Sequence, residues 1–278
     1  MADRRERTSG AIVEPDHGDA QSAASQTGTL GKAMSVLEIV ASSQEPPRFT
    51  DILARCDQPR GTLHRQLSNL VEEGLLSLDR DHTYSLGLRL LMFASKAWAG
   101  NQFRAIAEPH LRRLHEATGE TVHLGVLRGT EVIYLDKVEG RQSVRMYSQI
   151  GNASPAYCTG VGKAALSALP DDKLRELACG IVFRRFTSTT IMSAEALIAE
   201  AHAIRECGNA YDREEHEPGI RCVAAPIHSA DRSFVAAVSV TGPAYRVSNE
   251  AIDKWAVTVR ETAAAIMEDM RVRMSPRA

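Results

Sequence analysis

The sequence predicts an α+β fold in two parts, and three observations carry this prediction. Three helical patterns between residues 30 and 73 are followed at once by two short strand candidates. A further helical pattern at residues 88–99 leads into a longer segment in which strand candidates alternate with helices. Short helices ahead of a hairpin, and antiparallel strands with helices packed on them, are both α+β arrangements.

Length, composition and charge place the chain among ordinary globular proteins. It has 278 residues, 44% of them hydrophobic and 24% charged, which suffices for one large domain or two ordinary ones. The net charge of −2 gives no overall basic field that would indicate a nucleic-acid partner. No stretch approaches the ~20 consecutive apolar residues of a membrane helix, so no membrane partner is expected. Residues 1–27 contain no aromatic residue and no periodicity, and we expect a disordered tail there.

The cysteines bear on location and on metals. They are odd in number and widely scattered, at Cys56, Cys158, Cys179, Cys207 and Cys222. They form no C-x-x-C pair and no Cys/His spacing typical of zinc, and no secretory signal precedes them. We therefore expect reduced thiols in a cytoplasmic protein that holds no metal and no cofactor.

The first two helices are short and amphipathic. The first stops before the Gln-Glu-Pro-Pro of residues 44–47, and its apolar stripe is Leu30, Ala33, Met34, Leu37, Val40 and Ala41. We expect Thr50 to cap the second helix, with Ile52, Leu53 and Cys56 turned inward. A tight turn at residues 57–58 then leads to a third helix.

The third helix, over residues 58–71, is the most informative stretch for function. Pro59 suits its first helical position, and the stripe that faces a core is Leu63, Leu67, Leu70 and Val71. Its other face carries groups that hydrogen-bond and no acid: Arg60, Gly61, Thr62, His64, Arg65, Ser68 and Asn69. Arginine can pair with guanine, asparagine with adenine, and threonine or serine with base edges or phosphates. These seven residues are predicted to contact double-stranded DNA.

A hairpin follows the third helix. Gly74 ends the helix, and strand candidates at residues 75–78 and 82–86 flank a polar turn, which completes a winged helix-turn-helix layout. Between residues 30 and 90, eight acidic residues outnumber seven basic ones, which counts against DNA binding by bulk charge. The acids avoid the third helix, which favours a directed DNA-binding face. A winged helix that binds a protein instead of DNA stays an open alternative.

Beyond the linker pattern at residues 88–99, which Gly100 and Asn101 break, helices and strands alternate. Helices are expected at residues 102–118, 160–169, 171–178, 193–207 and 249–272. Strands are expected at residues 122–127, 131–138, 143–150, 221–227 and 234–241. This segment is typical of a sensor-type domain built on an antiparallel sheet.

Several motifs, in matching order and spacing, carry a resemblance to a known family. Thr62-Leu63-His64-Arg65 with Gly74-Leu75-Leu76 is similar to a recognition helix and its exit into a wing. Residues 157–164 (Tyr-Cys-Thr-Gly-Val-Gly-Lys-Ala), 211–215, 219–226 and 239–243 are similar to effector-site motifs. Together they make the chain resemble the IclR family of bacterial transcription regulators from about Leu30 to Arg271.

The resemblance implies a domain plan and a function. It implies a DNA-binding domain at residues 28–87, a linker helix at 88–101, and an effector-binding and oligomerisation domain related to the GAF fold at 102–278. It also implies a ligand-responsive regulator, and we expect it to repress a catabolic operon rather than activate one. We expect a homodimer or homotetramer on a near-palindromic operator, because one short recognition helix contacts few bases. The linker residues available to a partner subunit are Leu88, Leu90, Leu91, Phe93 and Trp98.

The same motifs predict a pocket for a small carboxylate. Backbone N–H groups at a helix start after the glycines of residues 160 and 162 favour an anion, and hydroxyl and carboxyl side chains can bond ligand hydroxyls. The predicted effector-binding residues are Met146, Thr159, Gly160, Val161, Asp212, Cys222, Ser239 and Thr241. Threonine stands at 241 where the resemblance leads us to expect serine. Residues 145–148 and 157–159 look more like family members that sense sugar acids, so a sugar acid or 2-keto acid is expected, with an aromatic acid as the alternative.

Several of these residues and their neighbours allow other interpretations. Gly-x-Gly before a helix can be only a tight turn, and the acidic run at residues 214–217 is interpreted as a solvated loop and not a metal site. His123 is interpreted as a satisfied strand histidine. A hydrolase that pairs Cys158 or Cys222 with His123 is disfavoured, because no nucleophile-elbow motif is present and the N-terminal helices would have no purpose.

Overall fold

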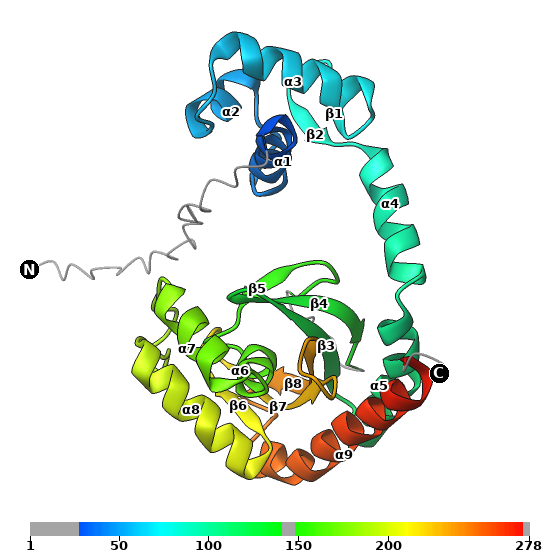
Figure 1. Ribbon diagram of the computed structural model, residues 1–278, viewed down its shortest axis with the longest axis vertical. Coiled ribbons are helices and arrows are strands. Elements are labelled where there is room, and N and C mark those ends of the chain that lie inside the picture. The colour runs from blue at the N-terminus through cyan, green and yellow to red at the C-terminus, as the bar shows by residue number, and fades with distance from the viewer. Residues whose placement is uncertain (1–27, 141–147, 275–278) are drawn as a thin grey trace, which may run out of the picture. The chain divides into compact units, whose positions relative to one another are not determined.

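The computed structural model describes residues 28–140 and 148–274 and divides the chain into two units, one ending at Lys96 and one beginning at Ala97 (Figure 1). Helices and antiparallel strands occur in both units, so the predicted α+β class is confirmed. Residues 1–27 and most of the strand expected at 143–150 lie outside the described residues.

The N-terminal unit is a winged helix-turn-helix. Its elements are α1 (Gly28–Ala41), α2 (Phe49–Arg55), α3 (Arg60–Glu72) and the antiparallel hairpin of β1 (Leu76–Leu78) and β2 (Tyr84–Leu86). The three helices and the hairpin share one core of buried side chains: Val36, Leu37, Val40, Ile52, Leu63, Leu67, Leu70 and Leu76. The predicted stripe of α1 was partly wrong, because Leu30 and Met34 are exposed and Val36 is buried in their place.

The start of α2 and the end of α3 are each fixed by specific hydrogen bonds. Thr50 was predicted to cap α2, but the cap position is Arg48, whose backbone N–H donates to Asp51 Oδ2 at 2.8 Å. Gly74, with φ +67°, follows α3: its N–H donates to Val71 O, and the N–H of Leu75 donates to Leu70 O. This pair of bonds is a Schellman motif, which explains the glycine.

Helix α4 (Leu88–Ala99) runs from the first unit into the second, and none of its residues is fully buried. Near its start, the Arg89 guanidinium donates to Glu73 O at 2.8 Å. Near its end, Trp98 Nε1 donates to Leu135 O at 2.9 Å, and the Arg104 guanidinium lies 3.7 Å from the centre of the Trp98 ring. Each end of α4 is therefore fastened to its own unit.

The C-terminal unit is built on an antiparallel sheet in the order β5-β4-β3-β8-β7-β6. The strands are β3 (Thr121–Arg128), β4 (Glu131–Val138), β5 (Ala153–Pro155), β6 (Ala210–Arg213), β7 (Ile220–His228) and β8 (Val235–Pro243). The helices are α5 (Gln102–Thr118), α6 (Gly160–Ser167), α7 (Asp171–Gly180), α8 (Ala194–Cys207) and α9 (Asn249–Met274). The edge strands β5 and β6 were not predicted, because three or four residues are too few for an alternating pattern.

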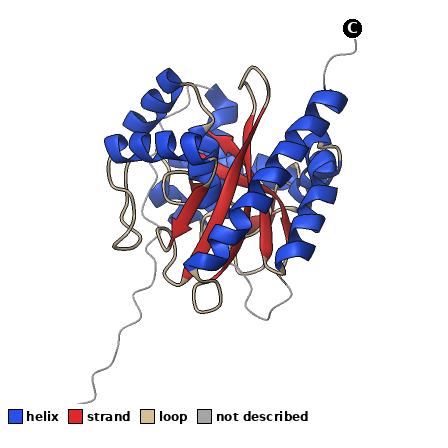
Figure 2. Ribbon diagram, turned by 90° about the horizontal axis from the view of Figure 1, so that it is seen from below, coloured by secondary structure: helices blue, strands red, loops and turns tan. Residues whose placement is uncertain are grey.

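Helices cover both faces of this sheet, as Figure 2 shows. On one face α5 and α9 pack against side chains such as Val223, Ala225 and Val238. On the other face α6, backed by α7 and α8, packs against the intervening residues, such as Ala224 and Ala237. None of the helices in the described part of the chain combines the length and apolarity that a membrane span requires.

Candidate functional site

Strand register gathers polar side chains on the α6 face of the sheet. Asp212 of β6 pairs with Cys222 of β7, and Cys222 pairs with Thr241 of β8. Two residues earlier on β8, Ser239 pairs with His123 of β3. Because alternate residues of a strand share a face, these five side chains form one polar cluster under α6.

A pocket opens over this cluster. The empty space over the cluster is about 460 Å³ when the solvent at its open mouth is included. The lining residues are His123, Tyr134, Ser148, Thr159, Gly160, Val161, Asp212, His216, Glu217, Ile220, Cys222, Ser239 and Thr241. No lysine or arginine lines the pocket within the described ranges, although the charges of Lys163 and Lys137 act on Asp212 and His123 from outside it.

The N-terminus of α6 forms one wall. Thr159 is its cap residue, and the Thr159 hydroxyl oxygen accepts the backbone N–H of Gly162 at 3.2 Å. The glycines are required by packing: a Cβ on Gly160 would lie 2.6 Å from Cys222 Sγ, and one on Gly162 would lie 2.3 Å from Ala156 Cα. Their small size lets the positive end of α6 approach the strand residues closely.

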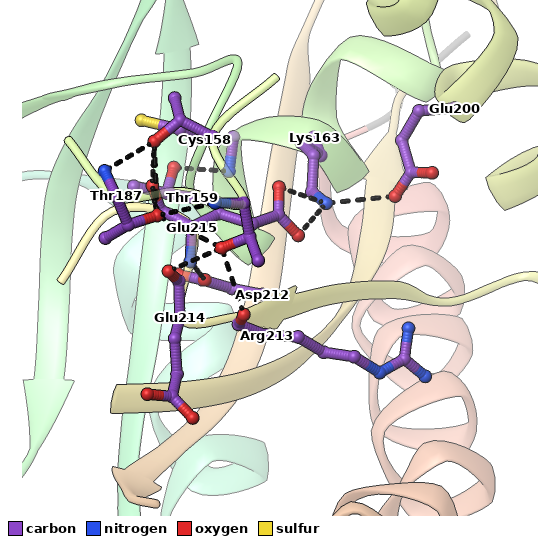
Figure 3. Close-up of polar contacts among 12 residues, drawn as sticks. Cys158, Thr159, Lys163, Thr187, Glu200, Asp212, Arg213, Glu214 and Glu215 are labelled. Atoms are coloured by element: carbon purple, nitrogen blue, oxygen red, sulfur yellow. Dashed lines mark hydrogen bonds and ion pairs between the residues drawn. The ribbon is translucent and has the colours of Figure 1, made fainter. Parts of the chain in front are cut away.

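Behind the pocket lies a buried ion pair that the sequence did not indicate. Figure 3 shows the Lys163 ammonium between two carboxylates, at 2.6 and 2.8 Å from the oxygens of Glu215 and 2.9 Å from Glu200. Only 2% of the Lys163 side chain is exposed. Burial alone would lower the pKa of Lys163, but the two carboxylates hold it above its usual value. The interpretation of residues 214–217 as a solvated loop was therefore wrong, since Glu215 is buried and paired.

Asp212 is tied to the same loop. Its Oδ1 accepts the backbone N–H of Glu215 at 2.7 Å, and Thr190 Oγ1 donates to the Glu215 carbonyl at 2.7 Å. Burial raises the pKa of Asp212 to about 7, because desolvation outweighs the Glu215 N–H bond and the Lys163 charge. Near neutral pH the pocket can thus present a protonated carboxyl group, which can donate to a ligand oxygen.

His123 lies on the β3 side of the pocket and is only 3% exposed. Its Nε2 is 2.7 Å from Ser148 Oγ, its Nδ1 is 3.3 Å from Thr241 Oγ1, and its ring packs 5.0 Å from that of Tyr134. Burial lowers its pKa to about 3, so the imidazole is neutral at physiological pH. The prediction that this histidine is satisfied is confirmed, but its place in the pocket was missed.

The two cysteines near the site are packing residues. Burial raises the pKa of Cys222 to about 12 and places that of Cys158 well above its usual range. Both therefore remain thiols. Neither is paired with His123, because both ring nitrogens of His123 bond to hydroxyls. Nor does the described part of the chain place three or more His, Cys, Asp or Glu side chains where they could hold a metal ion.

The structure brings together seven of the eight predicted effector-site residues: Thr159, Gly160, Val161, Asp212, Cys222, Ser239 and Thr241. Met146 lies outside the described residues. Five further lining residues were not predicted: Tyr134, Ser148, His216, Glu217 and Ile220. Ile220 lies within the motif at 219–226 and His216 and Glu217 lie between two motifs, whereas no motif indicated Tyr134.

The predicted DNA-binding residues all lie on α3. Arg60, Gly61, His64, Arg65, Ser68 and Asn69 are exposed, and Thr62 is half-buried. The Arg60 guanidinium lies 5.3 Å from the centre of the Phe49 ring, and the Ser68 hydroxyl donates to His64 O at 3.0 Å. Ser68 can therefore only accept a further hydrogen bond, whereas Arg65 and Asn69 keep free donor groups at the surface.

Sequence comparison explains this combination of a DNA-binding fold and a pocket. A family described as "Bacterial transcriptional regulator IclR C-terminal" matches residues 96–268, and one described as "IclR helix-turn-helix domain" matches residues 29–80. The chain belongs to the IclR family. It is accordingly a DNA-binding transcription regulator and not an enzyme, and the predicted resemblance is confirmed.

Relatives of this regulator match over most of its length. The transcriptional repressor IclR of Escherichia coli is 29% identical over 244 residues, covering 87% of this chain and 89% of the relative. The crystal structure of the Thermotoga maritima IclR is 32% identical with a TM-score of 0.66, covering 87% of this chain and 98% of that one. An IclR homologue of Microbacterium hydrocarbonoxydans, solved with 4-hydroxybenzoate, has the same fold at 24% identity and a TM-score of 0.71, covering 88% and 99%.

Proposed function

We propose that this IclR-family regulator is a repressor of a catabolic operon, acting in the cytoplasm, whose affinity for its operator changes when a small carboxylate binds the C-terminal pocket. The observation that carries the proposal is the polar pocket under α6, which seven of the residues predicted for effector binding line. The pocket belongs to one unit and α3 belongs to the other, and α4 connects the two.

The pocket chemistry supports an acid that also carries hydroxyl or keto groups. Its polar lining supplies hydroxyls from Ser148, Ser239 and Thr241 and a phenol from Tyr134, which would lose their hydrogen bonds to water against an apolar ring. The N-terminus of α6 and the protonated carboxyl of Asp212 are the groups suited to a ligand carboxylate. We therefore favour a sugar acid or a 2-keto acid. An aromatic acid is the second candidate, because the Microbacterium homologue was solved with 4-hydroxybenzoate.

We favour repression over activation of transcription because the E. coli relative is named a transcriptional repressor. Binding as a homodimer or homotetramer to a near-palindromic operator follows from the short α3, which contacts too few bases alone. The apolar side chains on α4 that suit a partner subunit are Leu88, Leu91, Met92 and Phe93, all more than half exposed.

A gel shift and a thermal-shift panel test the proposal. Fragments from the regulator's own chromosomal neighbourhood should be retarded at a salt concentration where random DNA of equal length is not. The panel contains gluconate, 2-oxobutanoate and 4-hydroxybenzoate. An acid present at about 100 times its Kd stabilises the fold by roughly 2.7 kcal/mol, which a melting curve shows readily. Stabilisation by 4-hydroxybenzoate alone would favour the aromatic class, and no retardation at any salt would contradict the DNA-binding role.

A further inference from the structure

His123 has hydrogen-bonding partners on both ring nitrogens, and the two distances differ. The Nε2–Ser148 Oγ distance is 2.7 Å and the Nδ1–Thr241 Oγ1 distance is 3.3 Å. Bonds from a hydroxyl donor are commonest at about 2.7–2.8 Å and bonds from an N–H donor at about 2.9–3.0 Å, so the shorter contact suits a hydroxyl donor better. The geometry therefore fits a Ser148 hydroxyl that donates to Nε2, and an Nδ1–H that donates to the oxygen of Thr241.

A neutral imidazole has one donor and one acceptor, so this assignment fixes the protons around it. Ser148 donates its only hydroxyl proton to His123, so toward the pocket it can only accept a hydrogen bond. Thr241 accepts from His123, and its own proton is left for another acceptor. The nearby Cys222 sulfur, protonated because its pKa is raised to about 12, is a weak acceptor.

Ser239 is independent evidence for a ligand oxygen at this end of the pocket. Its side chain is 0% exposed and lines the pocket, two residues before Thr241 on β8. Among the described residues, Ser239 Oγ makes no hydrogen bond of ordinary geometry, and the neighbouring Cys222 sulfur offers it only a weak acceptor. A buried hydroxyl without a good partner is costly, and in a native protein it calls for an explanation such as a bound water, ion or ligand.

We propose that His123 is a specificity-determining residue of the pocket. By donating to Thr241, it leaves the hydroxyls of Thr241 and Ser239 as two adjacent donors for a ligand oxygen that can only accept, such as a keto or carboxylate oxygen. This inference rests on the proposed function, since it refines the class of acid that the pocket takes.

The His123 tautomer can be measured without any ligand. In ¹⁵N-histidine-labelled full-length protein, the His123 signal is identified by its loss in His123→Phe. It should show the neutral Nδ1–H form from pH 6 to pH 8. A neutral Nε2–H form would overturn the inference, because Nδ1 would then be an acceptor and Thr241 would have to donate its proton to the imidazole.

Ligand selectivity tests the consequence. The probes are 2-oxobutanoate and 2-hydroxybutanoate, which differ only in a keto oxygen against a hydroxyl group. Both oxygens can accept from Thr241 and Ser239, but the hydroxyl proton of 2-hydroxybutanoate meets no acceptor between these two donors. Wild type should therefore prefer the keto acid by about tenfold in Kd. His123→Phe keeps an aromatic ring beside Tyr134 and should lose most of this preference. His228→Gln removes an imidazole at the far end of β7 and should retain it.

A double-mutant cycle separates positioning from simple packing. Thr241→Val removes the hydroxyl but keeps the shape, and Thr241→Ser restores the hydroxyl. If His123 acts through Thr241, adding His123→Phe to Thr241→Val should change keto-acid affinity by less than about twofold, while Thr241→Ser behaves as wild type. Additive losses would overturn the inference. If neither acid binds wild type, the proposed ligand class fails, and the tautomer measurement still decides the role of His123.

Discussion

Lys163 and Glu215 form a buried ion pair directly behind the polar pocket, with Nζ 2.6 Å from Oε1 and 2.8 Å from Oε2. Glu215 also donates its backbone N–H to Asp212 Oδ1. The pair therefore joins α6 to the loop that positions the pocket carboxyl group, and it links the pocket to α8 through Glu200.

Breaking this pair should destabilise the C-terminal unit strongly. Lys163→Met leaves the Glu215 carboxylate buried without its main partner, which typically costs about 3–5 kcal/mol. Urea unfolding of the variant should show that loss at pH 7. Lys163→Met combined with Glu215→Leu should recover much of it, because no charge is then buried alone. Equal stability of the wild type and Lys163→Met would show that the pair contributes little.

Asp212 should make stability depend on pH in a direction unusual for a carboxylate. Its pKa in the folded protein is about 7, against an ordinary value of 3.8, so the folded state holds this proton more tightly than the unfolded state. The free energy of unfolding should therefore fall as pH rises from about 4 to about 7. Asp212→Asn keeps the oxygen that accepts the Glu215 N–H and removes this dependence. The variant should gain roughly 2–4 kcal/mol relative to wild type between pH 4 and pH 8.

The control for this pH experiment is Asp172→Asn, since Asp172 is exposed on α7. Its unfolding free energy should differ from that of wild type by a constant amount across the same range. Parallel pH curves for wild type and Asp212→Asn would show that Asp212 is ionised in the folded protein throughout.

The structure shows which features sequence patterns can predict. The helix α5 was predicted with its observed bounds, because Asn101 caps it and Gly119, at φ +71°, ends it. Seven residues that line the pocket could be predicted because they lie within motifs, although the strand register that unites them could not. The buried pairing of Glu215 was missed because an acidic run looks solvated unless its distant partner Lys163 is known.

Arg65 should contribute directly to DNA recognition. Arg65→Ala is expected to weaken binding to the cognate operator by roughly 1–3 kcal/mol if the guanidinium reads a base, with little change for random DNA. A phosphate contact would instead weaken both and flatten the salt dependence. Lys173→Ala, an exposed cation of α7 in the other unit, is the matched control and should leave both affinities unchanged. Fluorescence anisotropy at several salt concentrations distinguishes these outcomes.

The exposed apolar side chains of α4 should form a subunit interface. Leu91 is 67% exposed and Phe93 is 52% exposed, so a buried charge introduced there would disfavour association. Leu91→Glu should lower the molar mass measured by light scattering toward that of one chain. Val182→Glu places the same charge at a 91% exposed valine outside α4 and should leave the mass unchanged. A wild-type protein that is monomeric throughout would contradict both this interface and the palindromic operator.

The central claim, that the pocket controls DNA binding, is tested most directly by measuring operator affinity with and without the acid that stabilises the fold most. For wild type, saturating acid should lower operator affinity, and saturating operator should lower the affinity for the acid by the same factor, because coupling between two sites is reciprocal. Asp212→Ala and Ser239→Ala should bind the operator as wild type does without acid and should no longer respond to it. The claim is contradicted if wild-type operator affinity is unchanged at saturating acid, or if these variants stay folded but lose operator binding without any acid.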